Sequence, residues 1–225
     1  MIYKLILQID TSAIGQSGEE TLPLFELLLK GGWLMIPIFI LAIAAVYIFI
    51  ERYLTIKKAG EMEQNFMNKI RDMVVNGNIE GAIDLCRQHN TPSSRMIMKG
   101  LTRIGNPLKD IAASIENAAN LEVFKLEKNL ATLATISGAA PMIGFLGTVT
   151  GMIRAFYNLA NAGNNIDPGM LAGGIYEALI TTATGLAVGI IAYIGYNLLT
   201  AMIEKVVFRM EGVTVEFIDI LHEPA

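Results

Sequence analysis

Three long stretches without a charged residue constrain what this chain can fold into. Residues 31–50, 129–153 and 178–203 contain no Asp, Glu, Lys or Arg. As α-helices rising about 1.5 Å per residue, each can cross the ~30 Å hydrocarbon core of a bilayer. Helices buried in soluble proteins are usually shorter and carry polar residues on a flank, so a soluble helical protein is the weaker interpretation. The stretches therefore predict three transmembrane helices, since lipid offers the backbone no other hydrogen-bond partners.

The N-terminus does not resemble a cleaved signal sequence. The apolar patch within residues 1–9 is very short, and polar residues follow it. We therefore expect the first span to remain as an anchor. The composition agrees with a membrane protein, because 53% of the residues are hydrophobic and only 17% are charged.

The distribution of Lys and Arg predicts the orientation of the spans. Residues 51–128 contain twelve of them and the C-terminal tail two, against two before the first span and one, Arg154, between the second and third spans. Positive charges mark the cytoplasmic side, so the middle segment and the C-terminus should be cytoplasmic. The N-terminus and the short loop should then face outward. The lone Cys86 would lie on the cytoplasmic side as a buried residue without a disulfide partner.

We expect an all-α membrane protein with three transmembrane helices, two of them long and extending into the cytoplasm, and a small cytoplasmic helical cluster. Turn signals at 76–78 and 90–92 interrupt that cluster. Asn106 and Pro107 look like the start of a long helix whose apolar spacing continues towards residue 130. The expected segments are an outward N-terminal segment (1–23), transmembrane helix 1 (24–53), the cytoplasmic cluster (54–106), a long helix with transmembrane helix 2 (107–158), an outer, periplasmic loop (159–172), and a long helix with transmembrane helix 3 and the tail (173–222).

Small and hydroxyl-bearing residues form one stripe on each of the last two spans. At about 100° per residue, the stripe on the second span centres on Thr148 and the stripe on the third span centres on Thr182. Small residues let helices approach closely in lipid, and threonines hydrogen-bond between helices or within one. Alternatively, Thr148 and Thr182 line a polar path for an ion, and the residues leave this choice open. The residues expected to pack helix against helix are Pro141, Gly144, Gly147, Gly151, Gly185 and Gly189.

Glu177 is the carboxylate closest to a span in a position that could be sheltered. It lies five residues outward of Thr182, and a regular wheel places it nearer the face of Thr181. It is either part of the ion path or an interfacial glutamate favoured by a helix N-terminal end. No carboxylate lies in the middle of a span. If protons cross here, a second protein should supply the titrating acid.

Several other function classes find no support in these residues. His89 and His222 lie in polar segments without a matching nucleophile or metal ligand, so we expect no enzyme, metal or cofactor. The net charge is −4, and basic residues alternate with acidic ones, which argues against nucleic-acid binding.

Two segments resemble a known family. "APMIGFLGTVTGMIRAF" (140–156) and "GIYEALITTATGLAVGIIAYIGYN" (174–197) are similar to the signature of the MotA/TolQ/ExbB proton channel family, most closely its ExbB and TolQ branch. The Glu51–Arg52 pair ending the first span is also common there. Flagellar stator subunits of the family generally have four spans, so they resemble this chain less.

The resemblance implies a homopentamer in the bacterial inner membrane. The ring would surround the helices of an ExbD-like or TolR-like partner whose intramembrane aspartate carries the proton, and would work through a TonB-like or TolA-like protein. By resemblance, Thr148 and Thr182 match the family's pore threonines and Glu177 its third-helix glutamate. An ExbB-like role in TonB-dependent transport, a TolQ-like or other motor role, and a passive membrane scaffold stay open, as does proton against sodium.

Overall fold

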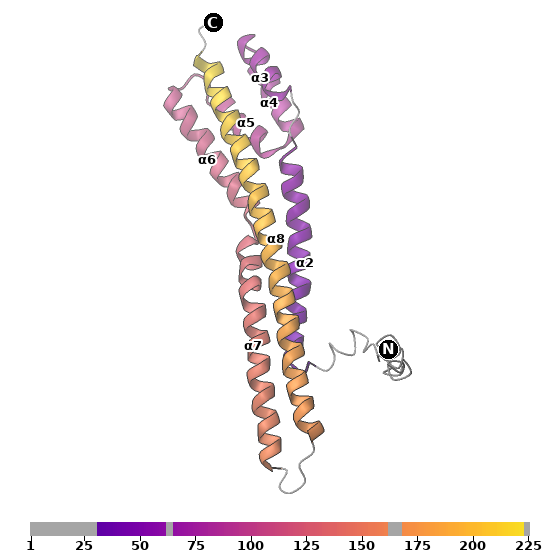
Figure 1. The fold of residues 1–225 in the computed structure, drawn as a ribbon. Helices are drawn as coiled ribbons and strands as arrows, with labels where there is room; N and C mark the ends of the chain where they lie inside the picture. Colours follow the sequence, from indigo (N-terminus) through magenta and orange to yellow (C-terminus); the bar gives the residue numbers. More distant parts are fainter. Residues whose placement is uncertain (1–30, 62–64, 162–167, 223–225) are drawn as a thin grey trace, which may run out of the picture.

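The described helices form a long rod (Figure 1). The computed structural model describes residues 31–61, 65–161 and 168–222. Their helices are α2 (Met35–Ala59), α3 (Phe66–Val75), α4 (Ile79–His89), α5 (Pro92–Leu101), α6 (Leu108–Leu126), α7 (Leu130–Asn161) and α8 (Pro168–His222). The helix α8 runs the length of the rod, with α7 along one half, α3 to α6 gathered around the other, and α2 along the middle (Figure 1).

Three helical stretches are long and apolar enough to cross a membrane: Met35–Ala59, Leu108–Asn161 and Leu171–His222. This confirms the expected all-α architecture with three candidate spans, two of them very long. The first helix begins at Met35, and the expected start at residue 24 lies outside the described residues. The helix α8, which contains the third stretch, begins at Pro168, earlier than the expected residue 173. A proline in the first turn costs the helix no hydrogen bond.

A break divides the long helix expected over 107–158. Asn129 has φ +64°, a left-handed conformation that asparagine tolerates better than most residues, and α7 begins directly after it. At its other end, α6 begins at Leu108, with Pro107 as its cap at φ −54° and ψ 140°. The guanidinium of Arg52 on α2 donates to the Lys125 carbonyl at 3.1 Å. Arg52 therefore satisfies one of the carbonyls left without a helical partner where α6 ends.

The half of the rod beyond the spans has a conventional apolar core. The turn signal at 76–78 lies between α3 and α4, and the one at 90–92 leads from α4 into Pro92, the first residue of α5. Thr91 caps α5 in a reciprocal capping box with Ser94. Cys86 is buried, and burial raises its pKa to about 12. The core joins α3 to α6 with the C-terminal half of α8 through the fully buried side chains of Phe66, Ile70, Met96, Ile97, Leu101, Ile115, Met210 and Phe217.

Candidate functional site

The contact between α7 and α8 is a close approach of two backbones. A Cβ atom added to Gly144 would lie 3.1 Å from the Thr182 Cα and 3.2 Å from the Gly185 Cα. A Cβ atom on Gly185 would lie 2.6 Å from the Ala140 carbonyl oxygen. Because these neighbours are backbone atoms, a larger residue would push the helices apart. We call this contact, which α7 makes through Ala140, Gly144, Gly147 and Gly151 and α8 through Ala178, Thr181, Thr182 and Gly185, the glycine seam.

Each residue named from the sequence for helix packing lies in or beside the glycine seam. Gly147 faces the Thr181 side chain, and Gly151 would bring a Cβ atom to 2.9 Å from that of Ala178. Further along, Gly189 packs against the Pro141 ring. The small-residue spacing thus corresponds to direct helix contact.

Thr182 forms a hydrogen bond between α8 and α7. Its hydroxyl donates to the Gly144 carbonyl at 2.7 Å, a bond between α8 and α7 in the middle of the seam. Such a bond between transmembrane helices supplies a partner for a polar group that lipid would leave unpaired. Thr182 is only half-buried, so one side of it faces outward from this subunit.

Thr148 has different surroundings. Its hydroxyl donates to the Phe145 carbonyl of its own helix at 2.6 Å. With Val149, Met152, Ile153 and Phe156 it lines an open, apolar hollow of about 560 Å³ on one face of α7. The structure therefore does not join Thr148 to Thr182 directly, although both lie on the last two spans. In an assembly, the side chains of a neighbouring helix that fill this hollow would also contact Thr148.

Glu177 lies on the side of α8 that faces the start of α2. Its carboxylate is 28% exposed and lies 3.8 Å from a guanidinium nitrogen of Arg154. The buried Thr181 hydroxyl is within hydrogen-bond distance of two carbonyls, at 2.8 Å from Glu177 and 2.9 Å from Gly31. Glu177 thus lies beside the same cavity as Thr181, as the wheel indicated, and its carboxylate lies next to Gly32 and Arg154.

A small polar cavity lies beside Glu177. Its volume is about 30 Å³, room for one water molecule, and Thr150 and Thr181 contribute hydroxyls to it. Its lining residues are Gly31, Trp33, Leu34, Gly147, Thr150, Gly151, Arg154, Glu177 and Thr181. Carboxylate, guanidinium and hydroxyl groups therefore meet in one place between the described spans. They could hold water or a proton, but they form no metal-binding group within the described ranges.

Sequence reasoning missed Arg154, which lines this cavity, and Gly32, which lies against the Glu177 carboxylate beside it. Gly32 has φ +70°, and a side chain there would collide with the Glu177 carboxylate. Arg154 was counted only as a charge of the outer loop. Gly31 and Gly32 lie far from Glu177 along the chain, so no spacing rule links them. Arg154, one turn from Gly151 on the same helix, was the available signal.

Comparison with known proteins identifies the family. Residues 88–212, more than half of the chain, match the sequence pattern of the MotA/TolQ/ExbB proton channel family. The chain belongs to this family. The matched region contains the whole glycine seam, Thr148, Thr182, Arg154 and Glu177. A MotA/TolQ/ExbB proton channel subunit is a multi-pass membrane protein that takes part in transport, not an enzyme, which confirms those expectations.

Individual relatives carry both ExbB and TolQ names. An ExbB homologue of Methanothermobacter thermautotrophicus is 35% identical over 134 residues, 58% of this chain and 47% of the relative. An ExbB-like protein of Synechocystis is 29% identical over 185 residues, 81% of this chain and 73% of the relative. The Tol-Pal system protein TolQ of Haemophilus influenzae is 35% identical over 139 residues, 62% of this chain and 56% of the relative. The aligned region thus spans about half the length of two of these three relatives.

Proposed function

We propose that this chain is an ExbB-like subunit of a motor that uses the proton-motive force to energise TonB-dependent transport across the outer membrane. Copies of the chain, five by the family resemblance, would surround the helices of an ExbD-like or TolR-like partner. One observation carries the proposal. The two last spans present threonine hydroxyls but contain no carboxylate within residues 129–153 or 178–203. The titrating acid then comes from the partner.

The wall formed by α7 and α8 suits a partner whose charge changes. An ionised aspartate is costly in an apolar environment, and protonation removes that cost. A neutral aspartic acid could then pass the apolar hollow beside Thr148. Glu177, Arg154 and the small polar cavity mark the outer end of the same helices and would accept or release the proton on that side. The partner's motion would reach a TonB-like or TolA-like protein.

The proposed location is the bacterial inner membrane, with a periplasmic N-terminus and a cytoplasmic C-terminus. The positive-inside rule supports this orientation, since fourteen of the 17 Lys and Arg residues lie on one side of the spans. Proton coupling, rather than sodium, is favoured by the family's description as proton channels.

The double variant Thr148→Val, Thr182→Val tests the proposal. Valine keeps the shape of threonine and removes both hydroxyls, so TonB-dependent uptake and proton flux should fall at least tenfold while the complex still assembles. Size-exclusion chromatography of the complex with its partner checks assembly, because Thr182 also bonds Gly144. Thr182→Ser keeps a hydroxyl at this position and should therefore retain function. Thr135→Val removes a hydroxyl at an exposed position on α7 and is the matched control, which should behave as wild type. Normal uptake by an assembled double variant would refute the pore role.

A TolQ-like role in envelope maintenance or division is the second candidate, supported by the 35% identity to TolQ of Haemophilus influenzae. Deletion of the gene should then cause defects in cell constriction instead of defects in uptake, and the neighbouring genes should encode Tol-type partners. A passive scaffold, which the glycine seam alone would serve, predicts that the threonine variants and Glu177→Ala have no phenotype.

A further inference from the structure

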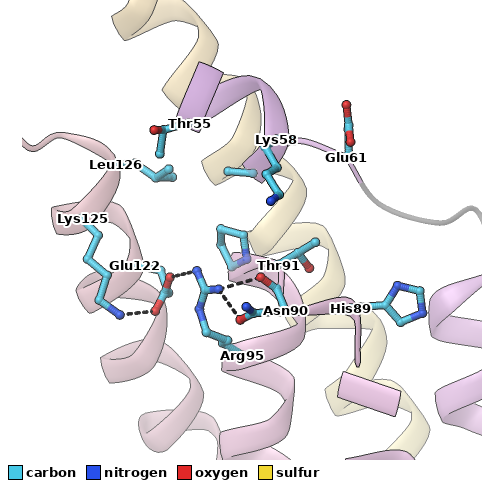
Figure 2. Close-up of a pocket in the computed structure, with 13 residues that line it drawn as sticks. Thr55, Lys58, Glu61, His89, Asn90, Thr91, Arg95, Glu122, Lys125 and Leu126 are labelled. Atoms are coloured by element: carbon cyan, nitrogen blue, oxygen red, sulfur yellow. Dashed lines mark hydrogen bonds and ion pairs between the residues drawn. The ribbon is translucent and has the colours of Figure 1, made fainter. Parts of the chain in front are cut away.

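A large open cavity lies just beyond the membrane-spanning part of the rod. Its volume is about 900 Å³, and it lies where the end of α2, the α4–α5 turn and the last turns of α6 meet (Figure 2). Its lining residues are Thr55, Lys58, Ala59, Gly60, Glu61, His89, Asn90, Thr91, Pro92, Arg95, Glu122, Lys125 and Leu126. It has no part in the function proposed above.

The cavity begins at the depth of the lipid headgroups. Thr55 lies five residues beyond the end of the first charge-free stretch, and Lys125 lies four residues before the second one begins. At 1.5 Å per residue these positions are about 6–8 Å outside the hydrocarbon. The polar headgroup layer is itself about 5–7 Å thick on each side of a bilayer. The near wall of the cavity is therefore within reach of a lipid phosphate.

Three cations from three different helices line the cavity: Lys58, Arg95 and Lys125. Arg95 and Lys125 both bind the Glu122 carboxylate, which they hold in place and neutralise. Figure 2 shows the Lys58 side chain extending from α2 towards the Arg95 guanidinium, while the Glu61 carboxylate points away from it. No hydrogen bond or ion pair holds the Lys58 ammonium in the described part of the chain.

Two further donors favour an anion in this cavity. The Arg95 Nε is buried and has no hydrogen-bond partner among the described residues, whereas its Nη1 donates to Asn90 at 2.7 and 2.9 Å. A buried donor without a partner is unfavourable, and a ligand oxygen would supply the missing hydrogen bond. The ten-residue helix α5 also begins here, so the positive end of its dipole adds to the field of the cations.

We propose that this cavity binds the phosphate of an anionic phospholipid headgroup. The headgroup would lie against Lys58 and Arg95, and the acyl chains would extend into the hydrocarbon beside α2. The Lys58 ammonium and the Arg95 Nε, neither of which pairs with a described residue, and the depth of the cavity point to a phosphate carried by the membrane in preference to one dissolved in water. The proposal requires only the three spans, so it stands or falls independently of the proposed motor function.

Native mass spectrometry of the delipidated, detergent-solubilised protein tests this site. The probes are dioleoyl phosphatidylglycerol, dioleoyl phosphatidylcholine and inorganic phosphate. Phosphatidylglycerol should bind at one molecule per chain and at least fivefold more tightly than phosphatidylcholine. Lys58→Gln should weaken it by about fivefold, the effect of one basic residue near an anionic lipid. Lys57→Gln, the matched control, removes the same charge from the neighbouring residue, which does not line the cavity, and should weaken it by less than twofold.

The outcomes separate the possible sources of binding. Equal losses for Lys58→Gln and Lys57→Gln would show general surface attraction and overturn the proposal. Equal affinity for both lipids would overturn it as well. Binding of inorganic phosphate without preference for phosphatidylglycerol would reassign the cavity to a soluble anion and refute the lipid. Both lysines are exposed, so unchanged thermal unfolding of the variants is expected and separates a binding effect from misfolding.

Discussion

At the scale of single residues, the glycine seam makes a sharp prediction. Gly185→Ala would place a methyl group 2.6 Å from the Ala140 carbonyl oxygen and 2.9 Å from the Gly144 Cα, and backbone atoms cannot move aside cheaply. We expect a loss of about 1–3 kcal/mol in unfolding free energy, the usual cost of overpacking. Thermal unfolding in detergent, followed by circular dichroism, measures it.

Gly138→Ala is the matched control, because it lies on α7 and a Cβ atom there would meet nothing within 4 Å. It should leave stability unchanged or slightly raised, since alanine favours helix. Equal effects of the two substitutions would mean that helix propensity, and not close packing, explains the glycines.

The limits of sequence reasoning also appear at single residues. The spacing of Gly144, Gly151 and Gly185 predicts the seam, because one helical period governs all of these positions. The same period correctly places Glu177 on a different face of its helix from Thr182. It says nothing of Gly32, whose contact with Glu177 depends on how two distant segments pack. Thr148 and Thr182 occupy similar stripes in the sequence. In the structure the Thr148 hydroxyl bonds a carbonyl of its own helix, whereas the Thr182 hydroxyl bonds a carbonyl of α7, a difference that only the packed helices reveal.

At the scale of helices, the carboxylate of Glu122 connects α5 to α6. Burial raises its pKa, but the hydrogen bonds from Arg95 and Lys125 outweigh burial and hold the pKa below the ordinary value of 4.5. A pKa that is lower in the folded state stabilises the fold above pH 4.5, and this contribution is lost as the pH falls through the folded-state pKa.

The unfolding free energy should therefore fall between pH 5 and pH 3, and Glu122→Gln should reduce this dependence because residue 122 then carries no titrating group. Denaturant unfolding at a series of pH values measures it. Glu116→Gln, at an exposed position of the same helix, should keep the wild-type profile. An identical profile for Glu122→Gln would show that the α5–α6 connection does not depend on this charge.

The helix break at Asn129 shows why boundaries were harder to predict than helices. Apolar spacing continues across residues 126–130, so the pattern favours one helix. The break arises from a left-handed Asn129 and from the Arg52 guanidinium, which bonds the Lys125 carbonyl. Asparagine was the sequence signal, because it tolerates the left-handed conformation better than most residues. The contact with α2 satisfies a carbonyl at the break, and the spacing of the sequence does not reveal it.

At the scale of the whole molecule, the charge-free stretches were sufficient to predict three spans and the helical class. Length explains this success, because few structures other than membrane helices need more than 18 apolar residues in a row. Neither the small polar cavity beside Glu177 nor the large open cavity beside Lys58 could be predicted in the same way. Each is assembled from at least three segments, and their meeting depends on the packing of α2 against α7 and α8, or against α5 and α6.

The rod is much longer than a bilayer is thick, and this makes its orientation testable. The 55 residues of α8 extend about 80 Å, so more than half of the helix must project from the ~30 Å hydrocarbon. Residues 51–128, which hold twelve of the 17 Lys and Arg residues, pack beside this end of α8, so the positive-inside rule predicts that it lies in the cytoplasm. In a Cys86→Ser background, Asn161→Cys at the end of α7 should therefore react with a membrane-impermeant maleimide in intact cells. Lys99→Cys, on the exposed face of α5, should react only after lysis. The reverse pattern would invert the topology and place the cavity beside Lys58 in the opposite leaflet. Labelling of both cysteines in intact cells would mean that the three charge-free helices do not span the membrane as a unit.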